Sequence, residues 1–311
     1  MPQSQQAKKS IEPGSMLPIR TVAHLTGINP VTLRAWERRY NLITPQRTPK
    51  GHRLYTEDDV ELIRQVLELL DQGISISQVK PLLEQTPGQQ KATSPARVGD
   101  VWKGYQGKML HAVETFDEHV LDSTYNDALS LYPVDVVNQR LVTPLLRIIG
   151  ERWKQRETGI IEEHFFSVYL RNKLGARIHH LNQRSNGPLL ILACLPGEYH
   201  EIGLLLFALA TVNFGYRVLI LGSNTPLDQL PKVLQQRPCA GIVLSGSSRP
   251  SRGLFESELP ELVKNSAIPV FVGGKTAARH QQKIEAGGAI CLGESISAGL
   301  RSMSQRLKPG K

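Results

Sequence analysis

The chain has 311 residues, of which 40% are hydrophobic and 21% are charged, and its formal net charge is +9. This length allows two or three domains, each with a hydrophobic core of its own. The N-terminus is polar, and no apolar run is long enough to cross a membrane. We therefore expect a cytoplasmic protein without a signal peptide and without a membrane partner.

The positive charge is concentrated near the N-terminus, where the stretch from Val31 to Tyr55 contains six basic residues and one acidic residue. Such a compact cluster favours a polyanionic partner, although a spread charge is usually only a solvated surface. The three cysteines, Cys194, Cys239 and Cys291, lie in apolar text without metal-site spacing. We expect buried, reduced thiols.

The first expected domain spans residues 17–86 and follows an N-terminal tail, residues 1–16, that we expect to be disordered. The text PIRTVAHLTGINPVTLRAWERRY predicts a short helix, a turn at Gly27 and Ile28, and a second helix. Asn29 can cap that helix, with Pro30 at its first position. The stretch LITPQRTPKGHRLY then predicts a wing-like hairpin, and two more helices follow, the first capped by Thr56.

This segment closely resembles the MerR-type winged helix-turn-helix DNA-binding domain, through TLRAWERRY and the basic wing KGHRLY. The resemblance implies that the second helix enters the major groove and that the wing holds the phosphate backbone. Arg34 and Arg38 are then the expected groove contacts, with Thr32 nearby. The expected phosphate contacts are Tyr40, Arg47, Lys50, His52 and Arg53. Alternatively, some of these arginines only pair with Glu37 or Asp58.

Residues 87–100, rich in Gln, Pro, Ser and Gly, are expected to form a flexible linker. Residues 101–184 show apolar positions at helical spacing, which predicts a four-helix bundle. Residues 187–308 contain five short, continuous apolar runs separated by helical stretches. Such runs predict a doubly wound, flavodoxin-like parallel sheet covered on both faces, with a ligand at the carboxyl ends of its strands.

His200 follows the first of these runs in the text EYHEIG, LSGSS comes after a later run, and VGG after another. A lone loop histidine is usually a surface residue, but this order and spacing resemble the D-x-H-x-x-G, S-x-L and G-G signature of cobalamin-binding domains. The resemblance implies that His200 is the lower axial ligand of the cobalt. The sequence departs from the family pattern at two positions: Glu198, where aspartate is commoner, and Ser247, which stands in place of leucine.

The chemistry of each residue in the signature suits that role. A neutral imidazole is a good cobalt ligand, and Glu198 can fix its orientation. Gly203 would allow the following helix to approach the nucleotide tail of the cofactor, and Gly273 and Gly274 would leave room for it. Ser245 would donate to the cofactor or to the Glu–His pair.

The helical segment carries Trp153, Glu163 and His164 in the order W-x(9)-E-H. This resembles the light-sensing CarH/LitR family, which joins a MerR domain to a cobalamin-binding module. The resemblance implies that Trp153 packs on the adenosyl group of adenosylcobalamin and that Glu163 and His164 line the same pocket. The alternative is a bundle-core tryptophan and a solvated EEH cluster. Family members carry a histidine at the position of Lys154, and a protonated lysine cannot bind cobalt.

We therefore expect a transcriptional regulator and not an enzyme, most readily a repressor. It would bind operator DNA in the dark as a homo-oligomer, a dimer or a tetramer, assembled by adenosylcobalamin, and release it on illumination. One alternative is a light-independent regulator that senses cobalamin or has lost it. Another is a corrinoid methyl carrier, against which the N-terminal DNA-binding segment argues.

Overall fold

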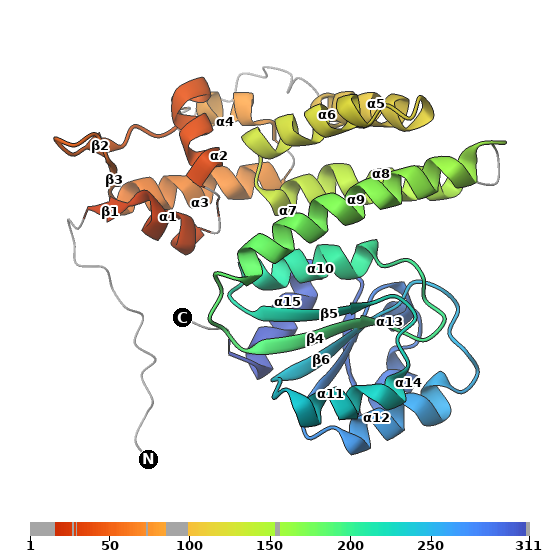
Figure 1. Cartoon of the computed structure of the whole chain (residues 1–311). Coiled ribbons are helices and arrows are strands. Elements are labelled where there is room, and N and C mark those ends of the chain that lie inside the picture. Colours follow the sequence, from red (N-terminus) through yellow and green to blue (C-terminus); the bar gives the residue numbers. More distant parts are fainter. Residues whose placement is uncertain are drawn as a thin grey trace, which may run out of the picture. The chain divides into compact units, whose positions relative to one another are not determined.

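The computed structural model describes residues 16–26, 28, 30–72, 74–84, 99–152 and 156–308. The expected tail, the bulk of the expected linker, and the turn and cap residues Gly27 and Asn29 lie outside these ranges. The chain divides into two compact units, Met1–Phe165 and Phe166–Lys311. Each is described by itself below, and Figure 1 shows the elements of both.

The first unit begins with the expected winged helix-turn-helix. Its helices are α1 (Ile19–Thr26) and α2 (Pro30–Ala35), and α2 continues directly into a π-helical turn, η1 (Trp36–Tyr40). A three-stranded antiparallel sheet in the order β1-β3-β2 forms the wing. Its strands are β1 (Leu17–Pro18), β2 (Gln46–Arg47) and β3 (Arg53–Tyr55). The hairpin of the sequence analysis is thus joined by a strand that the sequence did not predict.

Helices α3 (Glu57–Asp71) and α4 (Ile76–Leu83) complete this domain. Thr56 caps α3 as expected: its side chain accepts from the backbone of Asp59, whose carboxylate accepts from the backbone of Thr56. This reciprocal capping box satisfies two otherwise unpaired donors. The small core contains Val22, Ile28 and Leu33, each at most 1% exposed.

Four helical segments follow where the sequence predicts a bundle. The first two are α5 (Gly99–Glu114) and α6 (Glu118–Leu131). The third runs without interruption through α7 (Val134–Val137), the π-helical turn η2 (Asn138–Val142) and α8 (Thr143–Arg152). The fourth, α9 (Gly159–Asn182), crosses the division between the two units, so that its residues from Phe166 onward belong to the second.

The second unit is built on a five-stranded sheet in the order β5-β4-β6-β7-β8, with every pair parallel. The strands are β4 (Leu189–Cys194), β5 (Arg217–Gly222), β6 (Gly241–Ser245), β7 (Val270–Gly273) and β8 (Ile290–Gly293). This is the 2-1-3-4-5 order of flavodoxin-like folds, which confirms the predicted doubly wound sheet. All six residues of β4 are buried, as continuous apolar runs require.

Helices cover both faces of this sheet (Figure 1). On one face lie α10 (Ile202–Asn213) and α15 (Ile296–Arg306), and on the other α11 (Leu230–Gln236), after the short turn η3 (Leu227–Gln229), and α12 (Leu259–Asn265), after η4 (Leu254–Glu258). Two short helices, α13 (Lys275–Arg279) and α14 (Gln281–Ala286), precede β8. No described helix is long and apolar enough to cross a membrane.

The cysteines are only partly as predicted. Cys194 is fully buried at the end of the central strand, whereas Cys239 and Cys291 are half-buried beside the core. All three thiols are free. Burial raises the pKa of the Cys194 thiol to about 12, so this group stays protonated.

Candidate cofactor site and DNA interface

The candidate cofactor site of the second unit lies at the carboxyl ends of β4 and β6. After β4, the backbone N–H of Leu195 donates to the carbonyl of Ser245, the last residue of β6. This contact sets the loop that carries Glu198 and His200 beside the loop that follows β6. A loop at this edge of a parallel sheet is where ligands of such folds bind.

Glu198 is 2% exposed, and several hydrogen-bond donors surround its carboxylate. Its Oε1 accepts from the backbone N–H and the Nδ1 of His200, both at 2.8 Å, and from the hydroxyl of Ser248 at 3.1 Å. Its Oε2 accepts from the backbone N–H groups of Ser247 and Ser248 and from the hydroxyl of Ser247 at 2.9 Å. The buried carboxylate is therefore fully paired.

These donors decide the ionisation of Glu198. Burial alone would raise its pKa, but hydrogen bonds from the backbones of Ser247, His200 and Ser248 and from the Ser247 hydroxyl lower it to about 2. The group is therefore an anion at any physiological pH. With the carboxylate on Nδ1, the other ring nitrogen, Nε2, is the one that stays available to a ligand.

The imidazole of His200 is open to an incoming group. Its side chain is 66% exposed, although its orientation is fixed by the carboxylate beneath it. A metal-binding histidine ordinarily has its second nitrogen bonded to a carboxylate in this way. This donor set therefore fits a cobalt ligand, as the cobalamin signature implies.

Ser245 does not donate to the Glu–His pair, which corrects one of its two predicted roles; donation to a cofactor stays a prediction. As the last residue of β6 it pairs with Cys194 and Gly273 in the sheet. The donors to Glu198 are instead Ser247 and Ser248, two and three residues further on. Two adjacent hydroxyls directly after a strand were the sequence signal for this role.

The glycines of the signature differ from one another in what they allow. Gly274 has a φ of +91°, and a Cβ there would lie 2.4 Å from the carbonyl oxygen of Gly246. Its lack of a side chain serves packing within the chain, and the predicted room for a ligand is not found at that position. A Cβ at Gly273 would meet only ordinary contacts, and one at Gly203 would have no atom nearer than 4.0 Å.

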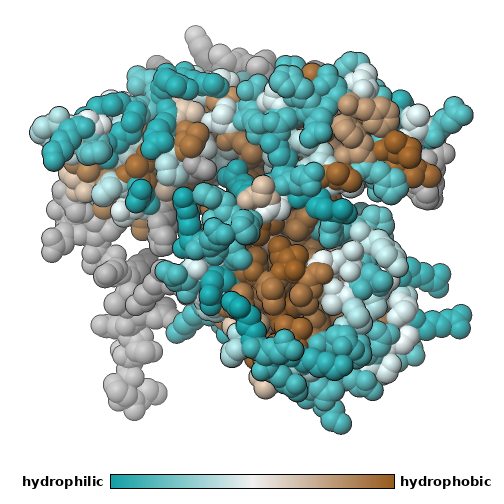
Figure 2. Space-filling model, in the orientation of Figure 1, coloured by the Kyte–Doolittle hydropathy of each residue, from teal (hydrophilic) through white to brown (hydrophobic). Residues whose placement is uncertain are grey.

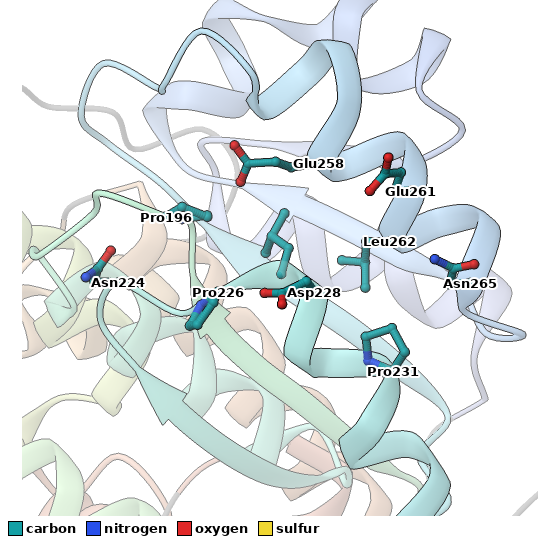
Figure 3. Close-up of a pocket in the computed structure, with 10 residues that line it drawn as sticks. Pro196, Asn224, Pro226, Asp228, Pro231, Glu258, Glu261, Leu262 and Asn265 are labelled. Atoms are coloured by element: carbon teal, nitrogen blue, oxygen red, sulfur yellow. The ribbon is translucent and has the colours of Figure 1, made fainter.

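The space beneath this loop is small, and the larger cavity lies beside it. The crevice next to Glu198 and Gly246 has a volume of about 10 Å³. A cavity of about 450 Å³ lies between η3–α11 and η4–α12, with Pro196 of the β4 loop at its wall (Figure 3). Three carboxylates line it, Asp228, Glu258 and Glu261, and His200 does not.

The upper-face residues expected in the bundle are only partly described. Trp153 and Lys154 lie outside the described residues. On α9, Glu163 is half-buried and His164 is exposed. Glu162, which the sequence did not single out, is 2% exposed and accepts from Arg156 at 3.1 Å and from Thr158 at 2.7 Å. Nothing in the text EEH distinguished this buried glutamate from its neighbour.

The DNA-facing residues of the first unit fall into two groups. Arg34, Arg38, Lys50 and His52 are exposed, and Tyr40 is half-buried. Thr32 is 1% exposed, which corrects its expected place at the groove, because that side of α2 packs against α6.

Two of the predicted phosphate contacts are ion-paired within the chain. Arg47 Nη2 lies 2.8 Å and Arg53 Nε 2.5 Å from the two carboxylate oxygens of Glu37. The pairing that the sequence left as an alternative is thus present. Burial opposes ionisation of Glu37, but hydrogen bonds from Arg53 and Arg47 lower its pKa. Glu37 lies in η1, so this pairing fixes the wing to the recognition segment.

Two family models match the N-terminal part of the chain. Residues 17–86 match the MerR HTH family regulatory proteins, and residues 105–178 match the B12 binding domain family. The HTH-type transcriptional repressor CarH of Myxococcus xanthus is 33% identical over 86% of this chain and 91% of its own length. The repressor CarA of the same organism is 31% identical over 88% of this chain and 91% of its own.

Among solved structures, the monomethylamine corrinoid protein of Methanosarcina barkeri superposes with a TM-score of 0.52. It is 15% identical and matches over 66% of this chain and 99% of its own, which shows a shared fold only. The full-length similarity to CarH and CarA, the two family matches and the described winged helix-turn-helix agree. The chain belongs to the family of MerR-type transcriptional repressors with a B12 binding domain that includes CarH and CarA, and it is a regulator, not an enzyme.

Proposed function

We propose that this protein is a light-responsive transcriptional repressor whose sensing cofactor is adenosylcobalamin. One observation carries the proposal most strongly: the buried Glu198 anion holds the Nδ1 of His200 at 2.8 Å and leaves the rest of the imidazole exposed. A regulator with no ligand at this edge would have no evident need for a fully paired, buried carboxylate, because burying a charge is costly.

His200 would bind the cobalt through Nε2, and Glu198 would hold Nδ1 and keep the ring correctly turned. Adenosylcobalamin, when bound, supplies a cobalt–carbon bond that light can break. Trp153, Glu163 and His164 would lie against the adenosyl side, as the family motif implies. Gly203 and Gly273 would lie beside the nucleotide tail, as the family signature implies.

On the DNA side, the exposed Arg34 and Arg38 would read the major groove. Lys50, His52 and the remaining N–H groups of Arg47 and Arg53 would hold phosphates. A single DNA-binding domain binds its operator weakly. Two or more linked DNA-binding domains on adjacent half-sites would bind the operator much more tightly. In the dark the cofactor-loaded chain would form that homo-oligomer, and illumination would dissociate it.

The surface of the second unit supports self-association. Figure 2 shows a hydrophobic area over strand β5, where Leu219 and Ile220 are half-buried and Leu221 is 38% exposed. Strand β5 is an edge of the sheet. An apolar patch on an edge strand is a common docking surface for another copy.

The competing function is a light-independent cobalamin sensor. The sequence supports it at Lys154, where an ammonium group stands in place of a histidine that could bind cobalt. Such a protein would need the cofactor for DNA binding but would ignore light.

A gel-shift on the DNA upstream of the protein's own gene separates these functions. Protein loaded with adenosylcobalamin is compared in the dark and after green light, with size-exclusion chromatography of the same samples. We expect binding and assembly in the dark, and loss of both after light. His200→Ala should remove both dark properties, whereas His180→Ala, at an exposed position on α9, should keep them. Binding that survives light would exclude the photoreceptor, and binding indifferent to the cofactor would exclude sensing altogether.

A further inference from the structure

The C-terminal end of α6 contacts the DNA-recognition segment within the first unit. The indole N–H of Trp36, the first residue of η1, donates to the carbonyl of Leu131 at 2.8 Å. Leu131 is the last residue of α6. The last carbonyls of a helix have no partner inside it, so an outside donor must satisfy them when the end is covered. Trp36 supplies that donor from the recognition segment.

The next residue reaches a second element. The hydroxyl of Tyr132 lies near the backbone of Ile76, the first residue of α4. The first N–H groups of a helix lack partners within it, so a nearby hydroxyl suits that position. Leu131 and Tyr132 therefore join an end of α6 to both η1 and α4, two separate elements of the winged helix-turn-helix. We call Trp36, Leu131 and Tyr132 together the α6 latch.

Aromatic packing surrounds the α6 latch. The ring centroid of Trp102 lies 4.6 Å from that of Tyr132 and 6.0 Å from that of Tyr105. Tyr132 is 3% exposed and Trp102 6%. Burial raises the pKa of Tyr132 to about 12. The contact is thus a packed interface and not an isolated surface hydrogen bond.

The α6 latch uses the side of the recognition segment that does not face DNA. Thr32 and Trp36 are at most 1% exposed, whereas Arg34 and Arg38 remain exposed. On a helix, residues 34 and 38 lie one turn apart on a common face, and residues 32 and 36 do so on another. The docked arrangement is therefore compatible with an open DNA-reading face.

We propose that the α6 latch fixes the direction in which the recognition helix points from the helical bundle, and that Trp36 and Tyr132 are positioning residues for DNA binding. The bundle then carries the DNA-binding head as one rigid body instead of leaving it free on the linker. In an assembly of several chains, a fixed head direction sets the distance between half-sites that the assembly accepts. This last step rests on the proposed oligomer; the docking itself does not.

The docking is tested directly by hydrogen exchange of tryptophan indoles in the full-length protein, followed by NMR. Trp36→Phe identifies the Trp36 signal. We expect its indole proton to exchange slowly in the wild type and about fivefold faster in Tyr132→Phe, as the loss of one polar contact beside it implies. Tyr216→Phe is the control, since it removes a buried hydroxyl that donates to Leu307 in the second unit. If the indole proton of Trp36 exchanged as fast in the wild type as in free tryptophan, the proposal would be overturned.

The positioning role is tested on DNA. Footprinting of the wild type on its own upstream DNA locates the half-sites, and about 5 bp, half a helical turn, is then inserted between them. The wild type should bind the altered DNA far more weakly than the natural one. In Tyr132→Phe and Trp36→Phe, the ratio of the two dissociation constants should fall about fivefold, whereas Tyr216→Phe should keep the wild-type ratio.

A variant that is merely less stable would lose affinity for both DNAs equally and leave that ratio unchanged. An unchanged ratio in Tyr132→Phe, with normal circular dichroism, would therefore overturn the positioning role. A wild-type footprint with one half-site would overturn the proposed assembly and the spacing role together, while the indole measurement still judges the docking contact.

Discussion

The carboxylate of Glu198 binds His200 twice, because the backbone N–H and the ring Nδ1 of His200 both donate to Oε1 at 2.8 Å. The loop backbone and the imidazole are thus oriented by the same oxygen atom. The other oxygen, Oε2, holds the loop after β6 through Ser247 and Ser248. A change at Glu198 therefore acts on the histidine and on the neighbouring loop together.

Glu198→Gln keeps the size of the side chain and removes its charge. The NH2 group of its amide would then face hydrogen-bond donors with a donor, and the imidazole would lose its fixed orientation. We expect cobalamin affinity to fall about 10- to 100-fold, as is typical when the partner of a metal-binding histidine is lost. The measurement is a titration followed by the visible spectrum of the cofactor.

The matched variant is Glu198→Asp. It keeps the charge with a side chain one methylene shorter, and we expect it to retain more of the affinity than the glutamine variant. If both variants bound cobalamin as the wild type does, Glu198 would not orient a cobalt ligand.

Acid should destabilise the protein through this same group. The pKa of Glu198 is lowered from 4.5 to about 2 in the folded protein, so its stabilising effect is complete above pH 4.5 and is lost as the pH falls toward about 2. The full effect is roughly 3 kcal/mol. The difference in free energy of unfolding between the wild type and Glu198→Gln should therefore shrink by roughly 3 kcal/mol as the pH falls from 4.5 toward about 2. Urea unfolding at a series of pH values measures it, and the other carboxylates cancel in the difference.

Two glycine substitutions separate folding from ligand contact. Gly274→Ala places a methyl group 2.4 Å from the Gly246 carbonyl at a φ of +91°, and should lower stability by about 1–3 kcal/mol. Gly203→Ala meets no atom nearer than 4.0 Å and should leave the melting temperature nearly unchanged. A loss of cobalamin affinity in Gly203→Ala at unchanged stability would report a direct ligand contact. A stable Gly274→Ala variant would contradict the close packing of the two loops.

Glu37→Gln tests the attachment of the wing to the recognition segment. Removal of a negative charge should by itself strengthen binding to a polyanion. Because Glu37 holds both Arg47 and Arg53 in place, we instead expect weaker operator binding, by several-fold, in fluorescence anisotropy. Glu61→Gln, which breaks only the exposed pair with Arg64, provides the effect of charge alone. Equal behaviour of the two variants would show that the wing is held by other means.

The sequence predicted what depends on local pattern. Continuous apolar runs such as the one that became β4 indicated the parallel strands, and the Thr56 capping box marked the start of α3. It did not predict which serine meets Glu198, because that depends on where β6 ends relative to β4. Nor could it show that Thr32 faces α6, since helical spacing identifies faces but not the distant element that covers a second one.

Helix α9 has a practical consequence for dividing the molecule into fragments. Its last residue, Asn182, donates to the carbonyl of Val218 and accepts from its N–H, both at 2.8 Å, and so occupies the open backbone groups of edge strand β5 at that point. On the same helix, Arg171 pairs with Glu201, next to His200. A fragment that starts at β4 would lack α9. It would expose the backbone groups of edge strand β5 and would also lose the Arg171–Glu201 pair that holds the loop of His200. Soluble expression of the sheet with intact ligand affinity should therefore require α9 to be included in the fragment.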